Sequence, residues 1–298
     1  MKTIVHNHST LPGETAPSLA DLLRAQAGAG CAVLTDGFYA ERDPVWLAIE
    51  CTSGVEPGPP ADYYGAGFTV PTPVICDHLH HQASLAVQRW RAAQAETSFP
   101  VKAVLPGPLT LAQLAEVRNS VYEDVSALAE AWATALLPEF SGLVEAGAKW
   151  IQIDEPGILR QPTLLRLARD LLQPFWDSRE DSFLIVSTWG PGAADWYAQL
   201  HSLPTDAVGV DLVANPELWD LIAEVGASQQ LYLGLANPFG HVCGDPHVRV
   251  KVKQVLHNYE FPLLHIGPSC GLQGLSPEAA LDTLRQIAEF AGDLSGKS

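Results

Sequence analysis

Short apolar runs and longer amphipathic stretches alternate along the chain. The apolar runs predict buried strands at residues 2–7, 31–35, 101–105, 149–154, 183–187, 207–210, 230–235 and 262–266. The amphipathic stretches predict helices at residues 17–29, from 43, 78–96, 110–146 with a break near Asn119, after 162, 193–201, from 216, 246–258 and from 277.

Strands that alternate with helices are typical of a parallel α/β sheet, and eight such units favour a single (β/α)8 TIM barrel over residues 1–298. A doubly wound open sheet is the alternative, but no Gly-x-Gly-x-x-Gly fingerprint follows the first strand. Residues at about 52–75 are rich in Gly, Pro and Tyr, which predicts an irregular excursion, with room for a hairpin at 63–70.

Composition narrows the class of protein. The chain has 298 residues, with 17 basic and 34 acidic side chains and a net charge of −17. This charge disfavours nucleic acid and anionic membranes as partners, so we expect small-molecule substrates. We find neither a bilayer-spanning run nor an initial signal pattern, and the five cysteines lack disulfide-type spacing. These features predict a reducing, cytoplasmic location.

Polar residues follow nearly every predicted strand. Asp154 and Glu155 end the run Ile151-Gln152-Ile153, and carboxylates are rarely buried without a partner, so the pair indicates a polar site at the mouth of the sheet. Caps of the next helix or surface ion pairs are the alternative. The other candidate substrate-binding residues at strand exits are His6, His8, Asp36, Trp189 and Asp211. In a barrel these exits share one mouth, which predicts a single pocket.

Two metal sites are conceivable. His6-x-His8 lies on one strand face, but the further ligands of a hydrolase site are missing, which favours substrate or cap contacts. His241-x-Cys243 together with Cys270 offers one His and two Cys, a ligand set suited to zinc with an open fourth position. Cys270 as a nucleophile would need a base such as His241 or His265. The remaining cysteines are expected to be small buried residues.

Several of these segments carry a family likeness over essentially the whole chain. They are Ile151-Gln152-Ile153-Asp154-Glu155-Pro156, Leu105-Pro106-Gly107-Pro108-Leu109-Thr110, Asp36-Gly37 with Asp43, and Pro268-Ser269-Cys270-Gly271-Leu272. Together they resemble the cobalamin-independent methionine synthase family. The resemblance implies a (β/α)8 barrel that transfers a methyl group from methyltetrahydrofolate to homocysteine, with a zinc ion that binds the thiol. It also implies that Asp154 holds the substrate amino group and that Cys270 is a zinc ligand.

The remaining family positions depart from the zinc-binding pattern. Val186-Ser187-Thr188 stands where the catalytic half of the family has His-x-Cys, Asp211 replaces a glutamate, and Phe38 replaces an acid. The tract Ser187-Thr188-Trp189-Gly190 with Val210-Asp211-Leu212-Val213 is similar to the amino-terminal barrel of the family, the half without zinc. His241 and Cys243 could complete a zinc site with Cys270 in place of the lost ligands.

Three functions follow from the sequence. The first is a methionine-synthase-like methyltransferase with Asp154 and Cys270 as catalytic residues, methyltetrahydrofolate as co-substrate and a possible zinc. The second is a barrel that binds an amino acid or pterin without methyl transfer. The third is a uroporphyrinogen-decarboxylase-like enzyme, which would need several arginines for substrate carboxylates. Only Arg24 and Arg42 precede residue 89, which disfavours the third function.

Overall fold

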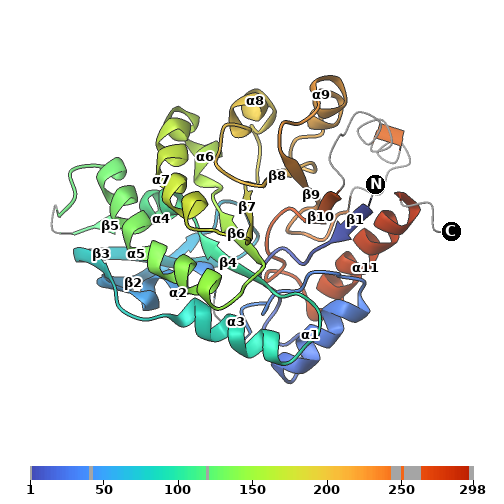
Figure 1. Ribbon diagram of the computed structural model, residues 1–298, viewed down its shortest axis with the longest axis horizontal. Helices are drawn as coiled ribbons and strands as arrows, with labels where there is room; N and C mark the ends of the chain where they lie inside the picture. Colours follow the sequence, from blue (N-terminus) through green and yellow to red (C-terminus); the bar gives the residue numbers. More distant parts are fainter. Residues whose placement is uncertain (1, 40–42, 119–120, 243–249, 252–262, 295–298) are drawn as a thin grey trace.

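The computed structural model describes residues 2–39, 43–118, 121–242, 250–251 and 263–294. Among these residues a parallel seven-stranded sheet has the strand order β1-β10-β9-β8-β7-β6-β4 (Figure 1). Its strands are β1 (Lys2–Val5), β4 (Lys102–Pro106), β6 (Trp150–Asp154), β7 (Phe183–Ser187), β8 (Ala207–Asp211), β9 (Gln230–Ala236) and β10 (Leu263–Pro268). The predicted α/β fold is confirmed, because seven of the eight predicted strands form in order.

The eighth predicted strand, at 31–35, forms no regular strand. Val33 makes a single parallel bridge to His6 beyond β1, and Leu34 makes one to Val101 before β4. The amide of Ala32 donates to Val5 O at 2.8 Å, and Lys102 N donates to Leu34 O at 2.8 Å. Residues 32–34 therefore connect the two edges of the curled sheet through a few backbone hydrogen bonds.

Helices follow the strands and cover the outer face of the sheet (Figure 1). The α-helices are α1 (Leu19–Gly28), α2 (Pro44–Cys51), α3 (Leu85–Ala95), α4 (Pro108–Leu114), α5 (Val125–Glu145), α6 (Gly157–Arg160), α7 (Leu165–Asp177), α8 (Tyr197–Leu200), α9 (Leu218–Val225) and α11 (Pro277–Leu294). The predicted helix start at Asp43 is confirmed, since its side chain accepts from Trp46 N at 2.9 Å. The predicted helix at 246–258 lies mostly outside the described residues.

The segment at 52–75 forms an extended hairpin in place of irregular structure, and its turn lies within the hairpin predicted at 63–70. β2 (Thr52–Asp62) pairs antiparallel with β3 (Thr69–His81), and β5 (Glu116–Val117) adds to the other side of β3. β2 is an edge strand, where prolines are tolerated, and its register shifts between Pro57 and Pro60. The predicted helix start at His78 was also wrong, because residues 78–81 belong to β3.

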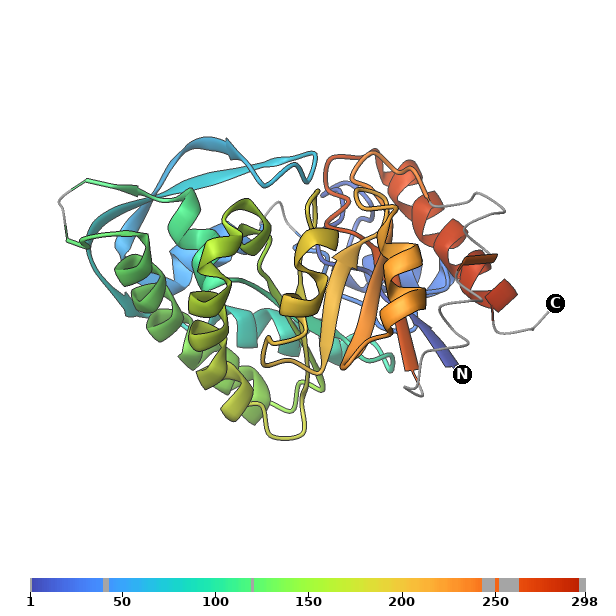
Figure 2. The ribbon, with the colours of Figure 1, turned by 90° about the horizontal axis from the view of Figure 1, so that it is seen from above.

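The turn of the hairpin, residues 63–68, reaches across the carboxyl ends of the sheet strands. In Figure 2 the light-blue hairpin extends toward the orange and red segments that follow β9 and β10. A Cβ atom on Gly274 would lie 2.3 Å from Gly67 O, and one on Gly67 would lie 3.0 Å from a Pro238 side-chain carbon. The hairpin turn therefore covers part of the mouth.

The inside of the curled sheet is unusually polar. Successive side chains of a strand point to opposite faces of the sheet. Ile151 and Ile153 pack on the outer face, in the large core that includes residues of the helices. Gln152 and Asp154 lie on the opposite, inner face. The buried polar and ionisable residues on these inner positions are His6, His8, Lys102, Gln152, Asp154 and His265. Barrel interiors are usually filled by branched aliphatic residues.

Candidate functional site

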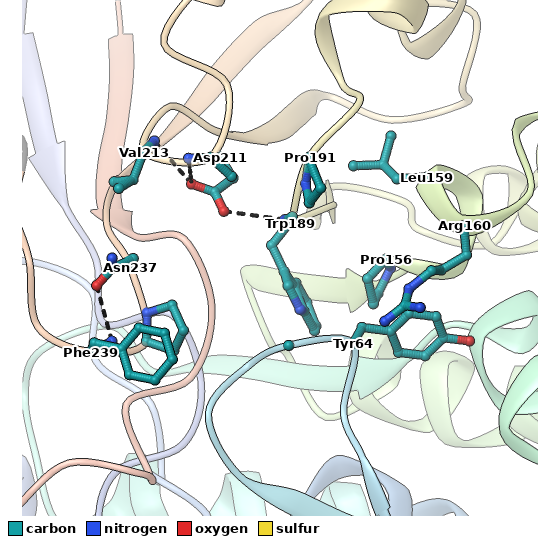
Figure 3. Close-up of a pocket in the computed structure, with 14 residues that line it drawn as sticks. Tyr64, Pro156, Leu159, Arg160, Trp189, Pro191, Asp211, Val213, Asn237 and Phe239 are labelled. Carbon is teal, nitrogen blue, oxygen red and sulfur yellow. Dashed lines mark hydrogen bonds between the residues drawn. The ribbon is translucent and has the colours of Figure 1, made fainter.

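A pocket of about 620 Å³ lies at the carboxyl ends of β6 to β9, below the hairpin turn. Its lining includes Tyr64 from the turn, Arg160 from α6, Trp189 after β7, Asp211 at the end of β8, and Phe239 after β9. Figure 3 shows Trp189 extending toward the turn that carries Tyr64, with Arg160 beside Tyr64. The Arg160 guanidinium lies 5.3 Å from the centre of the Tyr64 ring, in the range of a cation–π contact.

Asp211 organises the loops around this pocket. Its Oδ1 accepts hydrogen bonds from Val213 N and Ala214 N at 3.0 Å and from Ser269 Oγ at 2.7 Å, and its Oδ2 accepts from Gly190 N at 3.2 Å. The carboxylate thus ties together the loops after β7, β8 and β10. The structure places this predicted substrate-binding residue in the pocket wall and gives its charge four protein donors.

Glu155 points away from the pocket and caps a helix. Its carboxylate accepts from Leu109 N at 3.1 Å, from Thr110 N at 2.6 Å and from the Thr110 hydroxyl. These groups belong to the first turn of α4, where backbone amides lack partners within the helix. Burial raises the pKa of Glu155 to about 7. The carboxylate therefore caps α4, which precedes β6, and not the next helix named in the capping alternative. Its prediction as a substrate-binding residue gains no support.

The contact between Glu155 and α4 requires a residue without a side chain at position 107. A Cβ atom at that position would lie 2.2 Å from Glu155 Oε2 and 2.3 Å from the carboxyl carbon. The Thr110 hydroxyl also accepts from Gly157 N at 3.0 Å, which connects α4 to the start of α6. The Gly-Pro-Leu-Thr and Asp-Glu-Pro motifs therefore form one packed junction between the ends of β4 and β6.

Asp154 points into the interior beneath the pocket. Only 1% of the residue is exposed, and its Oδ1 accepts from Gln152 Nε2 at 2.7 Å. Its Oδ2 has no hydrogen-bond partner within the part of the chain that the structure describes. Burial raises the pKa of Asp154 and lowers that of its neighbour Lys102, because each group loses hydration of its charged form. A buried carboxylate oxygen without a donor is a candidate contact for a ligand.

Lys102 supports Asp154 through Gln152. The Lys102 ammonium donates to Gln152 Oε1 at 2.5 Å, which leaves the Gln152 amide nitrogen facing Asp154. Lys102 also lies 5.2 Å from the ring centre of Tyr232. Neither Lys102 nor Gln152 was among the predicted site residues. The available signal was a lysine inside the apolar run Val101-Lys102-Ala103-Val104-Leu105, a residue type that is almost never fully buried unless paired.

The two predicted histidines lie in the same interior. His8 Nε2 is 3.0 Å from Ser187 Oγ and 3.8 Å from Asp154 Oδ1. His6 Nε2 is 3.0 Å from His265 Nδ1, and His265 Nε2 is 3.0 Å from Gln230 Oε1. Burial lowers the pKa of each of the three imidazoles. His8 thus adjoins Asp154, whereas His6 belongs to a separate chain of hydrogen bonds.

Asp36 does not join the mouth pocket. Its Oδ2 accepts from Arg89 Nε of α3 at 2.7 Å, and its Oδ1 accepts from Phe38 N at 3.2 Å. The Arg89 guanidinium also lies 5.1 Å from the ring centre of Phe38. Asp36 therefore fixes the loop after residue 35 to α3, and its predicted contact with substrate gains no support from this geometry.

The described residues do not fit a zinc ion. No group of three His, Cys, Asp or Glu side chains with metal-binding geometry occurs within the described part of the chain. His241 is exposed, and its backbone and ring contact Asn237. Cys270 is buried, with its sulfur 3.6 Å from Gly271 O, and burial raises the pKa of its thiol. Cys243 lies outside the described residues.

Comparison with known proteins identifies the family. The model of the amino-terminal domain of cobalamin-independent synthases matches residues 68–239. The chain belongs to this family. The match also agrees with the predicted likeness to the amino-terminal barrel. Helices that could cross a membrane are not found among the described residues.

The curated relatives are much longer than this chain. A 5-methyltetrahydropteroyltriglutamate–homocysteine methyltransferase from Streptococcus gordonii is 30% identical over 149 residues, which cover 49% of this chain and 20% of the relative. The enzyme of the same name from Mesorhizobium japonicum is 38% identical over 125 residues, 42% of this chain and 15% of the relative. The matched segments thus span about a fifth or less of these relatives.

One solved structure matches almost the whole chain. A B12-independent methionine synthase from a Shewanella species, in complex with selenomethionine, superimposes with a TM-score of 0.80 at 19% identity. The match covers 98% of this chain and 97% of that protein. At this identity the likeness supports the fold, and the site must be argued from this chain's own residues.

Proposed function

We propose that this chain takes part in methyl transfer from a methyltetrahydrofolate-type donor to homocysteine, the reaction for which its curated relatives are named. Asp154 is the residue that binds the amino group of the acceptor. The observation that carries this assignment is the buried Asp154 Oδ2, which has no donor among the described residues. Asp154 ends β6, two residues before Pro156 in the wall of the mouth pocket. An ammonium group is the complementary donor.

The protein contributes binding and orientation in this proposal. Gln152 fixes one oxygen of Asp154, and Lys102 fixes the amide of Gln152, so the second oxygen is held in one direction. In the reaction, the acceptor sulfur forms a bond to the methyl carbon as the bond from that carbon to the donor nitrogen breaks. The acceptor thiol loses its proton, and the donor nitrogen gains one. Because the described residues do not fit zinc, no step is assigned to a metal.

Asp154→Asn tests the assignment. The purified chain is assayed for methionine formed from homocysteine and methyltetrahydropteroyltriglutamate, and binding of L-methionine is measured by calorimetry. We expect Asp154→Asn to weaken binding roughly ten- to a hundredfold, the range for a lost hydrogen bond to a charged group. Asp206→Asn is the matched control, because Asp206 lies at the opposite end of the sheet and pairs with Arg179 at 3.2 Å.

Each result has a defined meaning. Unchanged binding by a folded Asp154→Asn variant would remove Asp154 from the site. Binding by the natural chain without methionine formation would replace methyl transfer with the binding-barrel function. Metal analysis of protein purified without chelators is part of the same experiment, and about one zinc per chain would point to ligands that include Cys243.

A further inference from the structure

Three buried side chains around the hairpin turn and the end of β6 each have one polar atom without a hydrogen-bond partner among the described residues. The atoms are Tyr63 Oη in the turn, Trp189 Nε1 after β7, and Asp154 Oδ2 at the end of β6. The exposed fractions of these residues are 1%, 4% and 1%. Each comes from a different segment of the chain, so the fold itself brings the three atoms into one region.

A series of contacts places these residues beside one another. The rings of Tyr63 and Trp189 are 5.4 Å apart, and those of Trp189 and His8 are 5.7 Å apart. His8 Nε2 in turn lies 3.8 Å from Asp154 Oδ1. After burial itself, Asp154 is the strongest of the charged neighbours that raise the pKa of Tyr63. Tyr63 and Trp189 therefore lie in the same buried region as Asp154.

The hydrogen-bonding chemistry of the three atoms indicates which kind of ligand would bind them. Most buried polar atoms in proteins have a partner, so neighbouring atoms without one indicate a group that binds there. Asp154 Oδ2 accepts hydrogen bonds, an indole nitrogen only donates them, and a phenol can donate to an anion. The complement is a small molecule that carries a donor and an anionic acceptor close together. The ammonium and carboxylate of a free α-amino acid have this arrangement.

We propose that Tyr63 and Trp189 bind the α-carboxylate of the amino acid whose ammonium group is bound by Asp154. This inference rests on the proposed function, because it uses the same site and the same acceptor class. The side chain of the amino acid then extends past Trp189 into the mouth pocket, where Tyr64 and Pro156 also line the wall. Tyr63 and Trp189 thus determine specificity for free amino acids over amines.

Three ligands separate the two halves of the site. L-methionine carries both charged groups, 3-(methylthio)propylamine lacks the carboxylate, and 4-(methylthio)butanoate lacks the ammonium. Calorimetry with the full chain is expected to show that methionine binds roughly ten- to a hundredfold more tightly than either analogue. Equal affinity for methionine and the amine would overturn the proposal at once.

Variants of the carboxylate-binding residues and of Asp154 should affect different ligands. Tyr63→Phe is expected to weaken methionine binding roughly tenfold or more and to leave amine binding unchanged. Trp189→Phe, which also alters the pocket wall, is expected to weaken methionine binding roughly tenfold more than amine binding. Asp154→Asn is expected to weaken methionine and the amine and to leave the butanoate unchanged. A purely structural role for Tyr63 and Trp189 predicts equal losses for methionine and the amine, and that result would refute the inference.

Matched controls account for general effects of the substitutions. Trp132→Phe removes another buried indole nitrogen without a partner, but Trp132 lies in α5. Tyr197→Phe removes a hydroxyl that donates to Gly226 O at 2.8 Å in another part of the chain. Both should retain the preference for methionine. If that preference holds while methionine synthesis is absent, the proposed function fails and the carboxylate site stands.

Discussion

Glu155→Ala tests whether the second acid of the Asp-Glu pair stabilises the fold. The substitution removes the acceptor of two backbone amides, Leu109 N and Thr110 N, and of the Thr110 hydroxyl. It also leaves a space, because Glu155 is fully buried. The structure therefore predicts a loss of stability in a variant whose mouth pocket keeps all of its lining residues.

The size of the effect follows from the unpaired groups. A buried donor left without a partner costs about 1–3 kcal/mol, and two amides are affected. Water that enters the vacated space recovers part of this cost. We therefore expect the free energy of unfolding to fall by about 3 kcal/mol, a large value for a single substitution.

Urea denaturation at about pH 5, where most of the contribution of Glu155 is present, measures this free energy of unfolding by tryptophan fluorescence. With a slope of about 3 kcal/mol per molar, the midpoint should fall by about 1 M. Glu130→Ala, at an exposed position of α5, should change stability by no more than about 0.5 kcal/mol. If Glu155→Ala shifts the midpoint no more than this control does, the carboxylate is not the cap described above.

Three further predictions concern neighbouring features. Gly107→Ala should destabilise by about 1–3 kcal/mol because its Cβ would collide with Glu155, and calorimetry should find most of that cost absent in a Glu155→Ala background. The folded pKa of Glu155, about 7, lies above its ordinary 4.5, so its stabilising contribution is present below pH 4.5 and is lost as pH rises through 7. Between pH 4.5 and 7 the free energy of unfolding of the natural chain should therefore fall by about 3 kcal/mol more than that of Glu155→Gln. In the folded protein Cys270 should resist a thiol reagent, whereas the half-buried Cys76 should react. If the Cys270→Ala substitution removes the fast-reacting thiol, this prediction is wrong.

The strands could be predicted because both faces of a covered parallel sheet are buried. Such strands appear as short, nearly continuous apolar runs, and seven of the eight predicted runs form strands in the expected order. The sequence indicates a hairpin only at 63–70 and does not predict its long strands. Its prolines and glycines indicate irregular structure locally, but long-range pairing such as Thr52 with His81 extends both strands despite them.

The candidate site was predicted in outline. Asp154, Trp189 and Asp211 lie at the mouth or just beneath it, as expected of strand exits in a barrel. The partners that define their roles come from distant positions, so the local pattern could not reveal them. Tyr63 lies in the hairpin turn, and Lys102 reaches Gln152 from the neighbouring strand.

Asp154 and Glu155 show why a pair of acids in sequence need not be a pair in space. Successive side chains at the end of a strand point to opposite sides. Glu155 turns outward to the first turn of α4, where donors match its carboxylate. Asp154 turns inward, where Gln152 donates a hydrogen bond to one oxygen and no described group donates to the other. The motif therefore combines a structural cap with a ligand contact.

The polar interior of the sheet is consistent with a ligand-binding role for Asp154. Burying ionisable groups costs free energy unless they are paired, and an aliphatic filling would avoid the cost. Here Lys102, Gln152 and Asp154 form a hydrogen-bonded series that ends at an unpaired oxygen beneath the pocket. If these residues only filled space, their hydrogen bonds could close on one another. A series that leaves its last acceptor open is what a site for a charged ligand requires, because supporting contacts hold the binding atom in place before the ligand arrives.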